Sequence, residues 1–181
     1  MDNTHEIGQV IEFWRASGYE RWFNGGDAFD AQCGERFTDL HLAAARRECE
    51  TWMDSPDGAL ALLILLDQIP RNVYRGSGHA FATDALALHY ARRALDAGLD
   101  REVDADLRAF MYMPFEHSEA LADQQRAVSL FEALGDAQYL QYAQAHLEVI
   151  ERFGRFPHRN RALGRDSTAD EQAWLDAGGG F

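Results

Sequence analysis

The chain of 181 residues carries 30 acidic and 17 basic residues, which gives a formal net charge of −13 at pH 7. A surface dominated by carboxylates repels phosphate backbones and anionic headgroups, so general affinity for nucleic acid or for an anionic membrane is excluded. The length and the ordinary 46% hydrophobic content predict a single domain over residues 1–181. A domain of this size buries roughly 70% of the surface of its unfolded chain.

The cysteines and the apolar runs indicate the compartment. Cys33 and Cys49 are too few for a disulfide framework and lack CxxC spacing, so they are typical of small apolar residues in a reducing compartment. The first residues, MDNTHEIGQV, show no basic segment and no long apolar run, so we expect no signal peptide. The longest apolar run, ALALLILL at 59–66, is far shorter than the about 20 residues of a membrane span. We therefore expect a cytoplasmic protein that has no membrane partner.

Amphipathic periodicity of about 3.6 residues dominates the chain, and no segment shows the alternation of a half-buried strand. The apolar stripes predict about eight helices. The expected ranges are about 7–18, 28–53, 58–68, 84–97, 104–113, 117–134 and 137–153, followed by a short helix opened by the capping-box pattern STADE at 167–171.

The helix expected over 58–68 is apolar on every side, which places it at the centre of the domain. Pro70 should end this helix, because the residue before a proline is disfavoured in the α conformation. Helix starts near 84, 104, 118 and 137 put successive two-helix units about 34 residues apart, the period of tetratricopeptide repeats. The sequence thus predicts an all-α domain of stacked helical hairpins with a tetratricopeptide-like arrangement.

Three polar residues occupy positions that the apolar pattern would bury. Asp67 lies four residues after Leu63 in the central helix, where an unpaired carboxylate costs several kcal/mol. His146 lies in the middle of the apolar stripe of its helix, and His117 would share a face with the apolar residues that follow it. The Asp67 carboxylate should therefore have a cationic or hydrogen-bond-donating partner. The candidates are Arg71, one turn after Asp67, and Arg155, His158 and Arg159 from residues 152–165.

The segment RFGRFPHRNRALGR at 152–165 holds five arginines in an acidic chain. A shorter segment, DQIPRNVYRG at 67–76, has a similar Pro and Arg-Asn pattern. Glu116, Glu119 and Asp123 fall at i, i+3 and i+7, which would place three carboxylates on one edge of a helix. One interpretation is structural: an Arg-rich loop pairs with acidic helix edges in a buried ion network.

The same groups also allow a functional interpretation, because convergent arginines, asparagines and a histidine bind carboxylates or phosphates. Imidazoles and carboxylates beside them can transfer protons near neutral pH. The residues expected to line such a ligand-binding pocket are Asp67, Arg71, Asn72, Arg155, His158, Arg159 and Asn160. The acid–base candidates, should a reaction take place, are His117, Glu119, Asp123 and His146.

Motifs of named enzyme classes are missing from the sequence. There is no GxSxG, P-loop, GxGxxG or HExxH motif, and HSE at 117–119 lacks the CxxC partner of the zinc deaminases. A di-iron bundle needs two ExxH motifs, and there are none. A metal site built from His117, Asp123 and His146 is a minor alternative. We therefore expect no metal and no cofactor, and the sequence leaves open whether the protein is an enzyme.

Long stretches of the chain resemble a bacterial family known as domain of unknown function 924 (DUF924), whose members have a tetratricopeptide-like helical fold. The segments that carry the resemblance are VIEFW, LLDQIPRNVYRG, AFATDALAL, MPFEHSEALADQ, RFGRFPHRN and LGRDSTADE. Ile69 stands where the family has phenylalanine, a mild apolar exchange. The resemblance covers nearly the whole chain. It implies a compact all-α domain and implies no established activity.

Three hypotheses for function follow from these residues. The leading one is a helical-repeat protein that binds a small anionic molecule in a polar pocket formed by the two Arg-Asn loops and the HSE segment. The second is a protein-interaction module that takes a protein partner in a helical-repeat groove, by analogy with the fold. The third is that the motifs are purely structural. None of the three involves a nucleic-acid partner.

Overall fold

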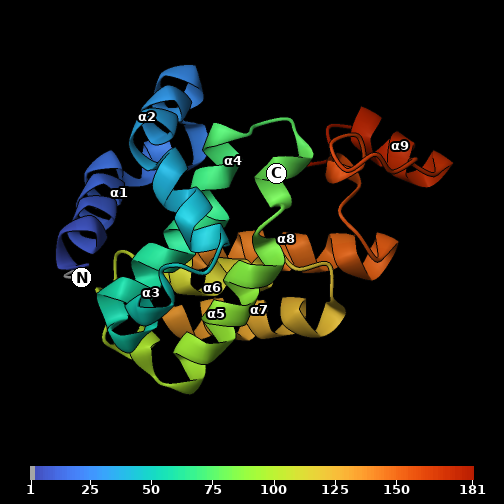
Figure 1. Cartoon of the computed structure of the whole chain (residues 1–181). Helices are drawn as coiled ribbons and strands as arrows, with labels where there is room; N and C mark the ends of the chain where they lie inside the picture. The colour runs from blue at the N-terminus through green and yellow to red at the C-terminus, as the bar shows by residue number, and fades with distance from the viewer. Residues whose placement is uncertain (1–2) are drawn as a thin grey trace. The chain divides into compact units, whose positions relative to one another are not determined.

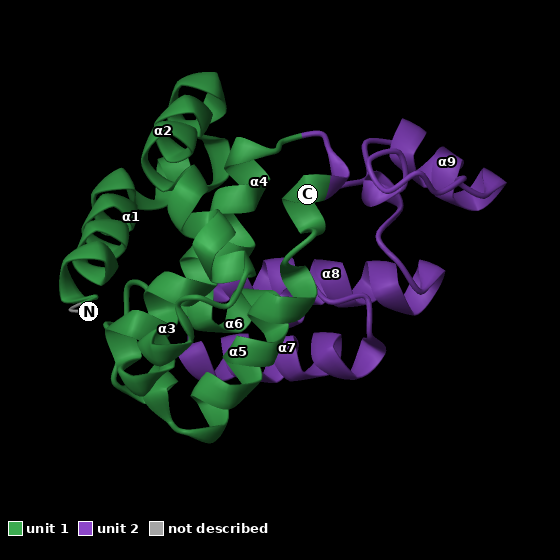
Figure 2. Ribbon diagram, in the orientation of Figure 1, with its two compact units in different colours: residues 1–75, 79–114 green, residues 76–78, 115–181 purple. Residues whose placement is uncertain are grey.

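The computed structural model describes residues 3–181, and its helices form two compact units (Figures 1 and 2). Unit 1 comprises the residues up to Arg75 together with His79–Pro114, and unit 2 comprises Gly76–Gly78 together with Phe115–Phe181. Throughout the described part of the chain the regular elements are helical, which confirms the all-α fold. None of the described helices is both long enough and apolar enough to cross a bilayer. That the chain is one domain stays a prediction.

The helices of unit 1 are α1 (Thr4–Asn24), α2 (Gly26–Ala45), α3 (Pro56–Leu63), α4 (Ile69–Val73), α5 (Asp84–Asp96) and most of α6 (Ala109–Glu116). Unit 2 holds the last two residues of α6, followed by α7 (Leu121–Leu134), α8 (Ala137–Phe153) and α9 (Ala169–Asp176). Short 3₁₀ turns lie at Glu50–Asp54, Gly78–Phe81, Leu99–Arg101 and Pro157–Arg159, and a π-helical turn lies at Ile64–Gln68. Because α6 and α7 begin later than expected, the tetratricopeptide-like stacking stays a prediction.

The apolar segment at 58–68, which the sequence places at the centre of the domain, forms the core of unit 1. Every residue from Gly58 to Pro70 is buried. Helices α1 and α5 pack against α3, and α2 packs against α4. The Ser55 hydroxyl accepts a hydrogen bond from the Gly58 backbone N–H at 3.1 Å and so caps the start of α3.

Pro70 does not end the central helix, contrary to the sequence prediction. The chain passes from α3 through the π-helical turn Ile64–Gln68 into α4, where Pro70 occupies one of the first two positions. A proline is tolerated in the first turn of a helix, since its missing N–H is not needed there. The π-helical turn resets the hydrogen-bond register just before Pro70 and allows the helical path to continue to Val73.

The helix predicted over 28–53 is also shorter than expected. Helix α2 ends at Ala45, and Arg47 adopts a left-handed φ of 64° that no α-helix continues through. The chain then enters the 3₁₀ turn Glu50–Asp54, which carries the buried Trp52 and Met53. The apolar stripe that predicted one long helix therefore comes from two elements.

Unit 2 is built on the antiparallel pair α7 and α8, which lie side by side (Figure 1). Helix α8 has the bounds that the sequence predicts. At its start the Asp136 carboxylate accepts hydrogen bonds from the backbone N–H groups of Gln138 and Tyr139 at 2.9 and 3.2 Å. At its end Gly154 takes a left-handed φ of 68°, which favours glycine. The Arg-rich segment (residues 152–165) starts at this end of α8 and leads to α9.

Candidate functional site

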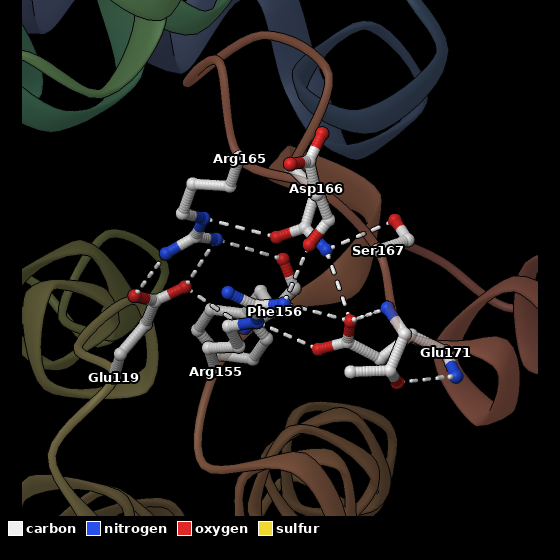
Figure 3. A network of polar contacts seen from close by, with 9 residues as sticks. Glu119, Arg155, Phe156, Arg165, Asp166, Ser167 and Glu171 are labelled. Atoms are coloured by element: carbon white, nitrogen blue, oxygen red, sulfur yellow. Dashed lines mark hydrogen bonds and ion pairs between the residues drawn. The ribbon is translucent and has the colours of Figure 1, made fainter.

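The Arg-rich segment pairs with carboxylates inside unit 2 (Figure 3). The Arg165 guanidinium binds both carboxylate oxygens of Glu119, at 2.8 and 2.9 Å, and also donates to the Phe156 carbonyl at 3.1 Å. The Phe156 backbone N–H donates to the same Glu119 carboxylate at 2.8 Å. Burial alone would raise the pKa of Glu119, but the hydrogen bonds from Arg165 and Phe156 outweigh it, so its pKa lies below the ordinary value. Glu119 is therefore a fixed anion near neutral pH.

A second bidentate pair joins the same segment to α9. Arg155 donates to Glu171 through Nε at 2.6 Å and Nη2 at 2.8 Å, and Glu171 also accepts from the Thr168 backbone N–H at 2.7 Å. These hydrogen bonds, led by those from Arg155, lower the pKa of Glu171 to about 2. The predicted capping box of Thr168 and Glu171 is present. Asn160 joins the two pairs, because its amide donates to Glu171 at 3.4 Å and its carbonyl accepts from Arg165 at 2.9 Å.

The segment before α7 differs from the sequence prediction. Helix α7 begins at Leu121, so His117 and Glu119 lie in a turn and do not share a helix edge with Asp123. The buried Gln124 amide holds this turn by donating to the carbonyls of Glu116 and Ser118 at 2.5 and 2.6 Å. The Ser118 hydroxyl donates to the Asp123 carboxylate at 2.8 Å. The predicted edge of three carboxylates on one helix is therefore wrong.

His146 is buried on α8, as its place in the apolar stripe predicts. Its Nδ1 lies 2.8 Å from the Tyr142 carbonyl oxygen and 3.0 Å from Oε1 of Glu116. Because a carbonyl oxygen only accepts, Nδ1 carries a hydrogen and donates it to the Tyr142 carbonyl. The acid–base candidates His117 and His146 come together, with ring centroids 6.3 Å apart.

The Phe156 ring, which is fully buried, is surrounded by cationic and imidazole groups. The rings of His146 and His158 lie 5.5 and 5.6 Å from its centroid, and the Arg159 guanidinium lies over its face at 4.4 Å. Arg159 also donates to the His117 carbonyl at 3.1 Å. We call His117, His146, His158 and Arg159 the histidine cluster.

His158 has the most perturbed environment of this cluster. Burial lowers the pKa of His158 to about 3, with further lowering by the charge of Arg159 and by the electrostatic effects of His146 and His117, against a smaller opposite effect of Glu119. Its Nδ1 is buried and has no hydrogen-bond partner among residues 3–181. The described residues contain no group of three or more His, Cys, Asp or Glu side chains placed to hold a metal ion. The cluster can thus donate to and stack with a ligand.

The remaining predicted residues lie in unit 1. Arg71 binds both oxygens of Asp84 at 2.8 and 3.0 Å and approaches Oδ1 of Asp67 at 3.4 Å, as the sequence suggested for Asp67. The Gln68 amide donates to the other oxygen of Asp67 at 2.6 Å. Asn72 donates to the Gln68 carbonyl at 3.0 Å. That these residues share a pocket with those of unit 2 stays a prediction.

Two residues with central places in the network were absent from the predicted site. The sequence marks Arg165 only as one of five arginines in its segment, and Glu171 only as the second residue of a capping box. Arg165 and Glu119 are 46 positions apart in the sequence, and no local pattern predicts a hydrogen bond between residues so far apart. The bond from Arg155 to Glu171 spans 16 positions. The sequence feature that points to Glu171 is its position in a capping box that closely follows a segment with five arginines.

Comparisons with known proteins agree with this description. The model of a family described as bacterial protein of unknown function (DUF924) matches residues 10–179. A solved structure of a protein of unknown function from Agrobacterium tumefaciens is 44% identical in sequence and superposes with a TM-score of 0.94, over 97% of this chain and 99% of that one. No curated protein matches the chain. Because the family model covers nearly all of the sequence, the protein belongs to the bacterial DUF924 family, as its segments suggested.

Proposed function

We propose that the histidine cluster of unit 2 binds a small anion, a carboxylate or a phosphate. His158 and Arg159 would hold the anion, and His117 and His146 would complete its surroundings. Arg155 and Asn160 would keep the Arg-rich segment in place through their bonds to Glu171 instead of touching the ligand. The anion-binding hypothesis is thus kept, with fewer ligand-contacting residues than the sequence suggested.

The observation that carries the proposal is the buried Nδ1 of His158. A buried polar atom that lacks a hydrogen-bond partner costs about 1–3 kcal/mol, so it is rarely left unpaired without a reason. The groups that act on His158 are Arg159, His146, His117 and Glu119, and Glu119 is already neutralised by Arg165. A bound anion would accept a hydrogen bond from His158 and offset the positive charge of Arg159.

The other hypotheses account for other parts of the molecule. The Glu119–Arg165 and Glu171–Arg155 pairs use both oxygens of each carboxylate, which supports a structural role for these four residues. A structural role does not account for the unpaired Nδ1 of His158. The protein-interaction hypothesis stays a prediction.

The test is calorimetric titration of the protein with orthophosphate, acetate and succinate, together with NMR titration of the histidine rings. Binding should raise the pKa of His158 from about 3, because a nearby anion favours the imidazolium form. Replacing Arg159 by alanine should weaken binding at least about tenfold, since a charge-assisted hydrogen bond contributes about 1.5–3 kcal/mol.

The matched control is Arg161→Ala, because Arg161 lies in the same segment and is exposed. It removes the same charge from the chain and should leave the affinity within about twofold. Since Arg159 is buried, Arg159→Ala can also lower stability, so His158→Gln provides a second variant of the cluster. The proposal fails if both variants fold and bind every anion as the unaltered protein does, or if no anion binds.

A further inference from the structure

The chain folds back onto the histidine cluster through its last residues, GGGF at 178–181. The Phe181 ring stacks on the His146 imidazole with a centroid distance of 3.6 Å and an interplanar angle of 13°. It also meets the edges of His158 and Phe156, at 5.7 and 6.3 Å, in T-shaped arrangements. An aromatic ring of the protein itself thus lies on the proposed anion site.

The glycines before Phe181 are required by this path. A Cβ at Gly179 would lie 2.3 to 2.6 Å from atoms of the Trp174 indole, so the backbone can lie on that ring only without a side chain. Gly178 and Gly180 have φ values of 87° and 144°, which other residues rarely adopt. The Gly179 N–H donates to the Trp174 carbonyl at 3.0 Å. The glycine run therefore positions Phe181 instead of leaving it as a loose end.

The contacts that keep the Phe181 ring in this position are nevertheless weak. Phe181 remains 52% exposed, the largest exposure among the exposed large hydrophobic residues of the described chain. Aromatic pairs add only a small stabilisation beyond burial, and the three rings that Phe181 contacts also pack against other side chains. A ring held this way can be displaced by a ligand that makes the same stacking contact and adds a charge.

We infer that the histidine cluster is an aryl-carboxylate site and that Phe181 is its internal, displaceable occupant. The His146 face accepts the planar ring of the ligand, His158 and Phe156 border it, and Arg159 pairs with the carboxylate. Ligand binding then requires that Phe181 leave, so the apparent affinity is reduced by the fraction of molecules in which the tail covers the site. This inference rests on the proposed anion binding and adds the ligand class and its regulation.

The experiment titrates the full chain with benzoate, with cyclohexanecarboxylate as a carboxylate whose ring is not planar, and with acetate. Benzoate should bind more tightly than the other two. Phe181→Ala should tighten benzoate binding about 3–10-fold, which corresponds to a site that the tail covers about 70–90% of the time. Gly179→Ala, which keeps Phe181 but prevents the tail from lying on Trp174, should tighten it as well. Leu121→Ala, a change at another exposed apolar residue of unit 2, should have no effect.

An NMR readout separates displacement from a general loosening of the protein. In the unaltered protein the Phe181 ring current should shift the ring protons of His146, and Phe181→Ala should remove that shift. Benzoate should restore a shift of the same sign in the variant.

The outcomes distinguish the two proposals. If acetate or phosphate binds and Arg159→Ala weakens it, but Phe181→Ala leaves benzoate affinity unchanged, anion binding stands and the inference about Phe181 is overturned. Equal affinity for benzoate and cyclohexanecarboxylate would overturn the aryl ligand class. If no anion binds to the unaltered protein or to Phe181→Ala, both proposals are wrong.

Discussion

Removal of the Glu171 carboxylate should destabilise the segment that carries the histidine cluster. Glu171 is only 2% exposed and accepts hydrogen bonds from Arg155, Thr168 and Asn160. Breaking a fully buried ion pair costs about 3–5 kcal/mol. The Arg155 side chain is 29% exposed, so water can solvate part of the charge left behind. We therefore expect Glu171→Ala to lower the free energy of unfolding by about 2–3 kcal/mol.

A double-mutant cycle isolates the contribution of the pair. Arg155→Ala should lower the free energy of unfolding less than Glu171→Ala does, because Arg155 is partly exposed, and the double variant should lower it by less than the sum of the two single variants. The measurement is urea unfolding followed by circular dichroism, with amide hydrogen exchange in α9 as a local probe. Asp170→Ala removes an exposed carboxylate from the same helical turn and should cost about 0.5 kcal/mol or less.

The pH dependence gives an independent check. The pKa of Glu171 is about 2 in the folded protein and 4.5 ordinarily, so the folded state favours the ionised carboxylate. Its stabilising effect is then fully present above about pH 4.5 and is lost as the pH falls from 4.5 toward 2. The stability difference between the unaltered protein and Glu171→Ala should shrink over that interval. Additive single variants, or a difference that is constant with pH, would refute the ion-pair argument.

Other changes test unit 1. Gly58→Ala should lower the free energy of unfolding by more than about 2 kcal/mol, because the new Cβ would lie 2.1 Å from the Trp52 carbonyl oxygen. Gly8→Ala should raise it by about 0.5–1 kcal/mol in the same unfolding assay, because Gly8 lies inside α1 and a Cβ there would meet nothing within 4 Å. Burial raises the pKa of Cys33 to about 12, so a thiol reagent at pH 8 should modify it only after unfolding; rapid modification of the native protein would contradict this. Asp67→Asn should lower the free energy of unfolding by about 2–4 kcal/mol, because Arg71 then has one ionised partner fewer. A decrease of less than about 0.5 kcal/mol in thermal unfolding would show that the charge of Asp67 does not stabilise the fold.

The parts of the fold that could be predicted are those governed by local pattern. Helix α8 has a strong apolar stripe, a cap at Asp136 and a stop at Gly154, and its predicted bounds are those observed. The predicted capping box at Thr168 is also present, because it depends on residues within three positions. The all-α fold was predicted from the same kind of local pattern, whereas the family was identified from the resemblance of long sequence segments.

The parts that could not be predicted depend on contacts between distant residues or on competing local geometry. The stretch 117–120 has helical periodicity, yet the Gln124 side chain takes the carbonyls that a helix would use, and Glu119 turns toward Arg165. Pro70 looked like a stop, because a π-helical turn has no pattern of its own in the sequence. Candidate site residues could be named by type, but their grouping into two units could not.

The spans of the bonds made by the Arg-rich segment bear on the order in which unit 2 folds. Helices α7 and α8 are joined by two residues, so their pairing closes a short loop and can occur early. The bonds to Glu119 and to the His117 carbonyl close loops of 37 to 46 residues, and they satisfy polar groups of the turn that precedes α7. The Arg-rich segment should therefore dock last onto a preformed hairpin. The histidine cluster combines His117 and His146 with His158 and Arg159 of the Arg-rich segment. It would therefore form only when this segment docks, at the end of the folding of unit 2.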